Sequence, residues 1–294
     1  MLKSAITKPR VIFSGIQPTG IPHLGNYAGA LRQWVKLQEK HKEDKLIYSI
    51  VDLHAITTPQ PADVLRKSKR EALAALLAIG IDPENVALFY QSSVRDPTPP
   101  TRYLVTDGKG ARSLRTHVDS QLYSISGIFI KNDTVEVPPQ TTTSPVQRVM
   151  SLQNPTEKMS KSSKSPKSRI SIIDSPEEIK AKIKAATTDS IPGINYNREE
   201  RPGISNLLDI MAIFDPEGRK AQELGEQYSD LSPKQLKEMV SDAVIGGLDG
   251  IRDRYAELLD KGDKYLDSIE AIGAEKARKS AEETMQVVRE AVGL

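Results

Sequence analysis

Residues 14–26, with the sequence SGIQPTGIPHLGN, form the first segment whose residue types could bind an anion. They connect a β-rich run at residues 11–13 to a helical pattern that starts at Tyr27. Ligands of open α/β sheets bind where a strand ends beside a helix N-terminus, and three glycines spaced five residues apart allow close backbone approach here. The segment differs from the familiar phosphate motifs, because Ile21 stands at the Walker lysine position and no G-x-G-x-x-G follows the strand. An ordinary βα turn, with His23 as a helix-entry residue, is the alternative interpretation of this loop alone.

Residues 158–169, with the sequence KMSKSSKSPKSR, form the second such segment. Between residues 147 and 169 there are six basic residues and one acid, although the whole chain is nearly balanced in charge. Lysine ammonium groups are mobile point charges that can follow a phosphate whose charge shifts during a reaction. The pattern therefore indicates a loop that stabilises a phosphate-transfer transition state, and a solvated loop or weak nucleic-acid patch is the alternative.

The composition is typical of a soluble globular protein. The 294 residues are 38% hydrophobic and 27% charged, and the formal net charge is +2, so any anionic ligand must be met by local clusters. With no cysteine and only four scattered histidines, neither a disulfide framework nor a zinc site is expected, and we predict no metal ligands. No apolar run is long enough to cross a membrane, so we expect no membrane partner.

The elements that position the first loop follow from hydrophobic periodicity. Three β-rich runs occur, at residues 11–13, 46–51 and 87–90. Helical patterns separate them, over residues 27–35 and 61–77, and the basic stretch 66–70 is expected to face mainly solvent. Alternation of this kind implies right-handed βαβ crossovers. The predicted fold class is therefore α/β, with a Rossmann-like parallel sheet.

The second half of the chain carries mainly helical signals. Ser175, Pro176 and Glu178 together make a helix start with a capping box. Apolar stripes over residues 236–244 and 266–288 predict a C-terminal α-helical bundle. We place the domain boundary at residue 187, which gives domains 1–186 and 187–294.

Two signatures taken together suggest a family. PTGIPHLGN in the first loop and KMSKS at residues 158–162 resemble the paired signatures of class I aminoacyl-tRNA synthetases. Flanking strings narrow the resemblance, over residues 11–94 and 137–294, to bacterial-type tryptophanyl-tRNA synthetases, a type that the mitochondrial members share. Those strings are FSGIQPTG, GNYAGAL, IVDLHAIT, IGIDPENVALFYQS, RVMSL, PGISNLL and AEKARKSAEETMQVVREAVGL.

The resemblance implies ATP-dependent activation of L-tryptophan and its transfer to tRNA(Trp). The tryptophan carboxylate attacks the α-phosphate of ATP, and pyrophosphate leaves with Mg²⁺ bound. Domain 1–186 would then be the ATP and amino-acid activation domain, and 187–294 the tRNA anticodon-binding domain. The family is homodimeric.

The resemblance also assigns roles to residues that match the motifs. His23, Lys158 and Lys161 would be catalytic, with His23 at the phosphates and the two lysines on the departing pyrophosphate. The ATP site would comprise Gln17, Pro18, Thr19, Gly25, Asn26, Val149, Lys158, Met159, Ser160, Lys161 and Ser162. Phe13, Asp52 and His54 would face tryptophan, although core or helix-cap roles remain open for Phe13 and His54.

Residues 95–136 depart from the family pattern. In this region the family supplies an aspartate that recognises the indole N–H, a Gly-acid-Asp-Gln segment near the ATP ribose, and much of the dimer interface. No matching string occurs in residues 95–136, and a site that lacks such a carboxylate loses affinity and discrimination. The alternative is therefore a catalytically impaired or shortened relative that only binds nucleotide or RNA. Another HxGN-type nucleotidylyl-transferring enzyme is a third possibility, which KMSKS and the helical C-terminal region disfavour.

The first ten residues bear on location. MLKSAITKPR carries three basic and no acidic side chains, as an organelle-targeting remnant would, although a short basic tail before a first strand is the commoner meaning of such a stretch. With the bacterial-type resemblance, this favours the mitochondrial matrix, and the bacterial cytoplasm is the alternative.

Overall fold

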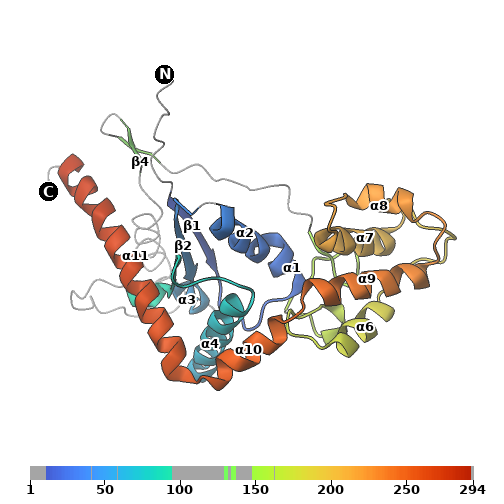
Figure 1. The fold of residues 1–294 in the computed structure, drawn as a ribbon, viewed down its shortest axis with the longest axis horizontal. Coiled ribbons are helices and arrows are strands. Elements are labelled where there is room, and N and C mark those ends of the chain that lie inside the picture. The colour runs from blue at the N-terminus through green and yellow to red at the C-terminus, as the bar shows by residue number, and fades with distance from the viewer. Residues whose placement is uncertain are drawn as a thin grey trace. The chain divides into compact units, whose positions relative to one another are not determined.

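The computed structural model describes residues 11–40, 42–57, 59–94, 129–131, 134–136, 148–161 and 163–292 (Figure 1). The chain divides into two compact units, and each is described by itself. The first unit comprises Met1–Gly20, Lys36–Thr142 and Lys261–Leu294, and the second comprises Ile21–Val35 and Thr143–Asp260.

A parallel three-stranded sheet forms the centre of the first unit. Strands β1 (Val11–Ile16), β2 (Lys45–Ile50) and β3 (Val86–Tyr90) lie in that order, and all neighbours are parallel. Strands β2 and β3 are buried almost throughout, as expected of strands covered on both faces. The α/β prediction is therefore confirmed.

Helices connect and cover these strands. Helix α3 (Asp52–Ala55) begins directly after β2, and the 3₁₀ turn η2 (Gln91–Val94) follows β3. Helix α4 (Ala62–Ala78) packs against β2 and ends before Gly80, whose φ of 104° is the left-handed conformation that the helix stop requires. In the same unit, the antiparallel pair β4 (Phe129–Lys131) and β5 (Thr134–Glu136) is the only described part of residues 95–136.

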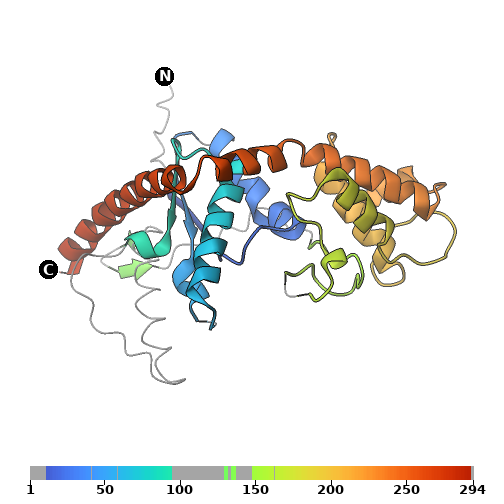
Figure 2. The same cartoon turned by 90° about the horizontal axis from the view of Figure 1, so that it is seen from below.

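The C-terminal helix α11 (Asp263–Val292) packs on the sheet, as both views show (Figures 1 and 2). Ala274 and Ala277 lie in one cluster with Ile47, Ala87 and Phe89. Gly273 permits this close approach, because a Cβ there would overlap the backbone carbonyl of Leu88. The prediction that the apolar stripe of residues 266–288 joins the C-terminal bundle is therefore wrong, since its small residues fit the surface of the strands.

The second unit is mainly helical, and it also contains the segment of residues 158–169, called the lysine-rich loop below. Its elements are α1 (Leu24–Asn26), the π-helical turn η1 (Tyr27–Leu31), η3 (Pro166–Ser168), α6 (Pro176–Lys184), α7 (Pro202–Phe214), α8 (Ala221–Gln227), α9 (Pro233–Gly247) and α10 (Ile251–Asp260). Helix α2 (Arg32–Lys40) continues from η1 across the division between units. The capping box predicted at α6 is confirmed, because Ser175 and Glu178 cap each other's backbone N–H groups.

Helix α7 forms the core of the second unit. It packs against α8 and α9, and its residues from Gly203 to Met211 are all buried. The boundary predicted at residue 187 falls inside this unit, because residues 149–172 pack with the helices that follow. As a division between activation and tRNA binding, that boundary stays a prediction. Within the described ranges, no helix is both long enough and apolar enough to span a bilayer.

Candidate active site

His23 begins the helical segment of the second unit. Its Nδ1 accepts a hydrogen bond from the backbone N–H of Gly25 at 3.0 Å, and its own N–H donates to Oδ1 of Asn26 at 3.2 Å. This reciprocal capping fixes the imidazole at the helix start and assigns the ring proton to Nε2, where it can donate to an anion.

The lysine-rich loop is joined to this segment. The N–H of Leu24 donates to the Ile170 carbonyl at 2.8 Å, and the N–H of Ile172 donates to the Pro22 carbonyl at 3.2 Å. His23 and Ser171 thereby form an antiparallel bridge directly after the loop ends. The C-terminal end of the lysine-rich loop is therefore paired with the residues that flank His23.

The N-terminal end of the lysine-rich loop is paired with residues 149–152. The N–H of Met159 donates to the Val149 carbonyl at 3.1 Å, and the N–H of Ser151 donates to the Glu157 carbonyl at 2.8 Å. Val149 and Met159 are both buried. The lysine-rich loop thus begins at the end of a short hairpin, in which the side chains of Val149 and Met159 are buried. Lys158 is exposed and Lys161 is half-buried.

The two signatures meet at Gly25. A Cβ on Gly25 would lie 3.7 Å from the Cβ of Met159 and 2.9 Å from Cε1 of His23. Gly25 at the helix start therefore lies close to both the imidazole and the first residues of the lysine-rich loop, and all three belong to the second unit.

The environment of His23 keeps the imidazole neutral. Burial, followed by the positive charges of Lys161 and Arg169, lowers its pKa to about 4. A neutral imidazole that donates from Nε2, with a lysine and an arginine nearby, suits a polyphosphate. Sequence reasoning counted Arg169 among the basic residues but gave it no role.

The remaining predicted ATP residues lie in the first unit. Gln17 and Thr19 are exposed and Pro18 is buried, in the loop that follows β1. The N–H of Thr19 donates to the Gln17 carbonyl at 2.9 Å, and Gly20 has a φ of 86°. The ATP roles of these residues stay predictions.

Phe13, one of the residues predicted to face tryptophan, packs against the cluster between the sheet and α11. It shares its face of the sheet with Ile47, its partner in register on β2. The contacts of Phe13 are therefore those of a core residue, which is the alternative interpretation of this position.

Asp52 is buried at the start of α3 with a full set of partners. Its carboxylate accepts from the N–H of Ser92 at 2.9 Å and from Oγ of Ser92 at 2.6 Å. Lys69 forms an ion pair with it at 2.5 Å and lies 4.2 Å from the centre of the Tyr90 ring. The prediction that residues 66–70 face mainly solvent is wrong for Lys69, because the buried carboxylate needs a cation.

His54 lies two residues beyond Asp52 on α3. Its Nδ1 is 3.3 Å from Oε1 of Gln91, whose Nε2 is buried and has no hydrogen-bond partner among the described residues. Gln91 was missed by sequence reasoning, although it follows directly after a predicted strand.

Asn206 of α7 is another residue that sequence reasoning missed. It is 3% exposed and hydrogen-bonds both the N–H and the carbonyl of Met150, beside Val149. It occurs in the string PGISNLL, which contributed to the resemblance only as a pattern.

Some predictions concern residues that the structure does not describe. Ser162 and most of residues 95–136 lie outside them. In the part of the chain that is described, no three His, Cys, Asp or Glu side chains cluster as metal ligands.

Comparison with known proteins identifies the class. The family model for class I tRNA synthetases (W and Y) matches residues 5–108 and 125–249. The chain therefore belongs to the class I tRNA synthetases.

Curated relatives narrow the class. A tryptophan–tRNA ligase of Enterococcus faecalis is 34% identical over 336 positions, covering 97% of this chain and 98% of the relative. Tryptophan–tRNA ligase 2 of Streptomyces avermitilis is 37% identical over 338 positions, covering 98% of each. Within its class, the chain is thus a member of the tryptophan–tRNA ligases.

Solved structures agree with this placement. Tryptophanyl-tRNA synthetase from Campylobacter jejuni, complexed with ADP and tryptophan, superposes with a TM-score of 0.67 at 26% identity. The match covers 97% of this chain and 100% of that one. The enzyme from Mycoplasma pneumoniae, at 23% identity and a TM-score of 0.71, covers 97% of this chain and 98% of its own, and supports the fold.

The alignments with the two curated relatives are longer than the chain. The 336 positions shared with the Enterococcus faecalis relative exceed the 294 residues available, so the relative has residues with no counterpart here. The family model leaves residues 109–124 unmatched. The unmatched range lies within the region of departure noted at residues 95–136.

Proposed function

We propose that this chain activates L-tryptophan with ATP and transfers it to tRNA(Trp). The observation that carries the proposal is the pairing of residues 22–24 with 170–172, which holds His23 beside the lysine-rich loop. A phosphate chain placed there would meet a neutral donor, the start of a helix and several cations within one unit.

The chemistry is displacement at phosphorus. A carboxylate oxygen of tryptophan forms a bond to the α-phosphorus of ATP, and the bond from that phosphorus to the bridging oxygen of pyrophosphate breaks. His23 donates from Nε2 to phosphate oxygens, and Lys158 and Lys161 neutralise the leaving pyrophosphate. A ribose hydroxyl of the tRNA then attacks the acyl carbon, and AMP leaves.

Magnesium accompanies ATP in this proposal. Phosphate oxygens are preferred Mg²⁺ ligands, so the ion would enter with the nucleotide and add positive charge to pyrophosphate. The residues of this chain that act beside it are His23, Lys158 and Lys161.

Charging of tRNA tests the complete function. Purified chain, ATP, Mg²⁺ and labelled tryptophan should yield labelled tRNA(Trp), and labelled tyrosine should not. Lys161→Ala should abolish charging, while Lys164→Ala, at an exposed lysine of the same loop, should retain it. Equal loss in both variants would contradict a specific role for Lys161.

A shortened relative that only binds nucleotide or RNA is the second candidate. It is favoured by the unmatched residues 109–124. ATP binding by calorimetry without tryptophan-dependent chemistry would support it over the active enzyme.

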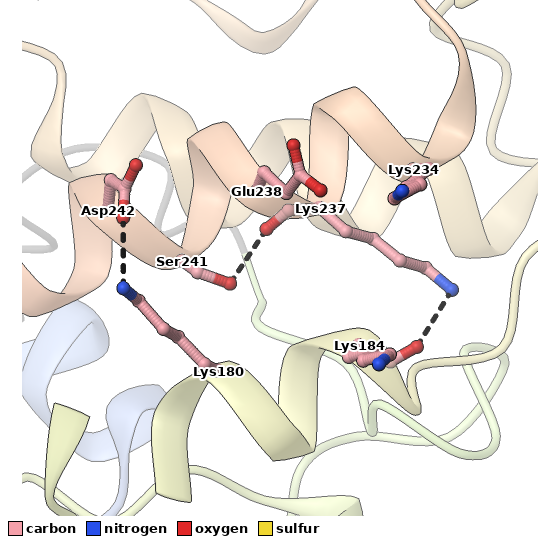
Figure 3. Close-up of a pocket in the computed structure, with 7 residues that line it drawn as sticks. All are labelled: Lys180, Lys184, Lys234, Lys237, Glu238, Ser241 and Asp242. Atoms are coloured by element: carbon pink, nitrogen blue, oxygen red, sulfur yellow. Dashed lines mark hydrogen bonds and ion pairs between the residues drawn. The ribbon is translucent and has the colours of Figure 1, made fainter. Parts of the chain in front are cut away.

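A groove between α6 and α9 supports contact with tRNA (Figure 3). It has a volume of about 710 Å³ and is lined by Lys180, Lys184, Lys234, Lys237, Glu238, Ser241 and Asp242. Lys180 pairs with Asp242 at 3.9 Å, and the ammonium of Lys237 donates to the carbonyl of Ala186 at 2.7 Å. The ammonium groups of Lys184, Lys234 and Lys237 outnumber the carboxylate of Glu238, so the groove keeps a net positive charge, which suits a phosphate backbone.

Salt-dependent RNA binding tests that contact. Lys184→Glu with Lys234→Glu should weaken tRNA binding and flatten its dependence on salt concentration. Lys40→Glu with Lys42→Glu, at two exposed lysines of the first unit, is the control for net charge. Equal effects of the groove variant and the control would exclude the groove.

The mitochondrial matrix and a homodimer complete the proposal. The basic first ten residues favour the matrix, and uptake of the full chain by isolated mitochondria tests it against a bacterial cytoplasmic origin. Sedimentation of the purified chain tests the dimer, whose interface in the family draws on the region that departs here.

A further inference from the structure

We propose that Asn206 is a positioning residue for the nucleotide site, which it serves by fixing the backbone of Met150. The inference rests on the proposed function, which assigns Val149 and the lysine-rich loop to ATP. Asn206 itself touches neither proposed substrate, and it acts through the hairpin that carries both.

The contact is a two-point clamp. Oδ1 of Asn206 accepts from the N–H of Met150 at 2.9 Å, and Nδ2 donates to the carbonyl of Met150 at 3.1 Å. Only this orientation of the side-chain amide satisfies both bonds. A single buried side chain therefore satisfies both backbone hydrogen-bonding groups of Met150, as a neighbouring β-strand would.

The clamp acts at the root of the lysine-rich loop. Met150 forms an antiparallel bridge with Lys158, and the carbonyl of the preceding Val149 accepts from the N–H of Met159. Displacement of Met150 would therefore shift both the backbone proposed to contact adenine and the first residues of the KMSKS signature.

Burial makes the clamp hard to replace. Asn206 is 3% exposed, on a helix whose neighbouring residues are buried as well. Removal of the amide would leave the N–H and the carbonyl of Met150 without their partner, which is costly in a site with little access to water.

The far end of α7 contacts the other signature. The ring of Phe214 stacks on Tyr27 with 6.1 Å between centroids and 14° between planes. The carbonyl of Ile213 accepts from the guanidinium of Arg32. Helix α7 thus touches the segment after His23 at one end and the hairpin at Asn206, so the clamp sets the hairpin relative to the helix start.

Hydrogen exchange tests the clamp directly in the full chain. In Asn206→Ala, backbone amides of residues 148–161 should exchange at least tenfold faster than in wild type. Ser205→Ala is the matched control, because Ser205 is equally buried on α7 but accepts from the N–H of Asn197 instead. This readout requires no activity, so it decides on the clamp even if the proposed function fails.

Kinetics test the consequence for the reaction. Asn206→Ala should raise the KM for ATP about tenfold and leave the KM for tryptophan within about twofold, because only the nucleotide hairpin moves. Asn206→Asp keeps one acceptor but sets a second acceptor against the Met150 carbonyl, so it should not restore the wild-type KM. Lower thermal stability of Asn206→Ala, with unchanged exchange at residues 148–161 and unchanged KM for ATP, would overturn the proposal.

Discussion

The backbone N–H of Gly25 donates to Nδ1 of His23 over 3.0 Å, within the first turn of the helix that follows the glycine-rich loop. This bond makes one nitrogen of the ring an acceptor and leaves the other as the proton carrier. The imidazole can therefore act as a donor to phosphate without being charged.

The lowered pKa of His23 predicts a pH dependence of stability. The folded value of about 4 lies below the ordinary 6.5, so the unfolded chain takes up the proton first as the pH falls. The stabilisation that comes from keeping His23 neutral is complete above pH 6.5 and is lost progressively down to about pH 4, by at most about 3.5 kcal/mol in the free energy of unfolding. Urea unfolding between pH 7 and 4 should show a weaker loss in His23→Gln. Parallel curves for the two proteins would contradict the neutral imidazole.

Gly25→Ala should impair activity and lower the free energy of unfolding only by the worth of one N-cap, about 1 kcal/mol. The added Cβ would lie 2.9 Å from Cε1 and 3.0 Å from Nδ1 of His23, so the ring must turn away from its bond to the Gly25 N–H. We expect tryptophan-dependent pyrophosphate exchange to fall about 100-fold, as when a preorganised donor is removed. Gly246→Ala is the control, because a Cβ there meets no atom within 4 Å. Full activity of Gly25→Ala would show that the ring position is unimportant.

Lys69→Met should destabilise the first unit. It leaves the buried carboxylate of Asp52 with Ser92 but without a cation, which we expect to cost about 2–4 kcal/mol. The control is Lys67→Met, whose side chain is 78% exposed and lies 3.8 Å from Glu71, with an expected change within about 0.5 kcal/mol. Chemical denaturation measures both, and equal small changes would mean that Asp52 does not need its cation.

Adjacent glycines of α9 should respond in opposite directions. Gly246→Ala gains helix propensity in open space, worth about 0.5–1 kcal/mol. Gly247→Ala places a Cβ into the ring of Phe214, which stacks on Tyr27. We therefore expect a raised melting temperature for the first variant and a lowered one for the second. A rise in both would contradict the packing of Phe214 against α9.

Sequence reasoning succeeded where the signal was local. The parallel strands and the capping box at Ser175 and Glu178 depend on short-range periodicity and chemistry, and the structure confirms them. The contact of the first loop with the lysine-rich loop required the family resemblance, since the segments are far apart in sequence.

What sequence reasoning missed depended on tertiary partners. A basic stretch predicts a solvated face, but Lys69 turns inward because Asp52 is buried beside it. An apolar stripe does not name the surface it covers, and small residues at Gly273 and Ala277 fit the sheet. Asn206 gives no chemical signal in sequence, because its role is to satisfy one backbone unit of Met150.

Tryptophan-dependent exchange of labelled pyrophosphate into ATP tests the central claim most directly, because it reports adenylate formation without tRNA. Exchange by the wild-type chain should depend on tryptophan and should fall at least about 100-fold in Lys161→Ala, with Lys164→Ala close to wild type. Binding of ATP without tryptophan-dependent exchange above the Lys161→Ala level would contradict it.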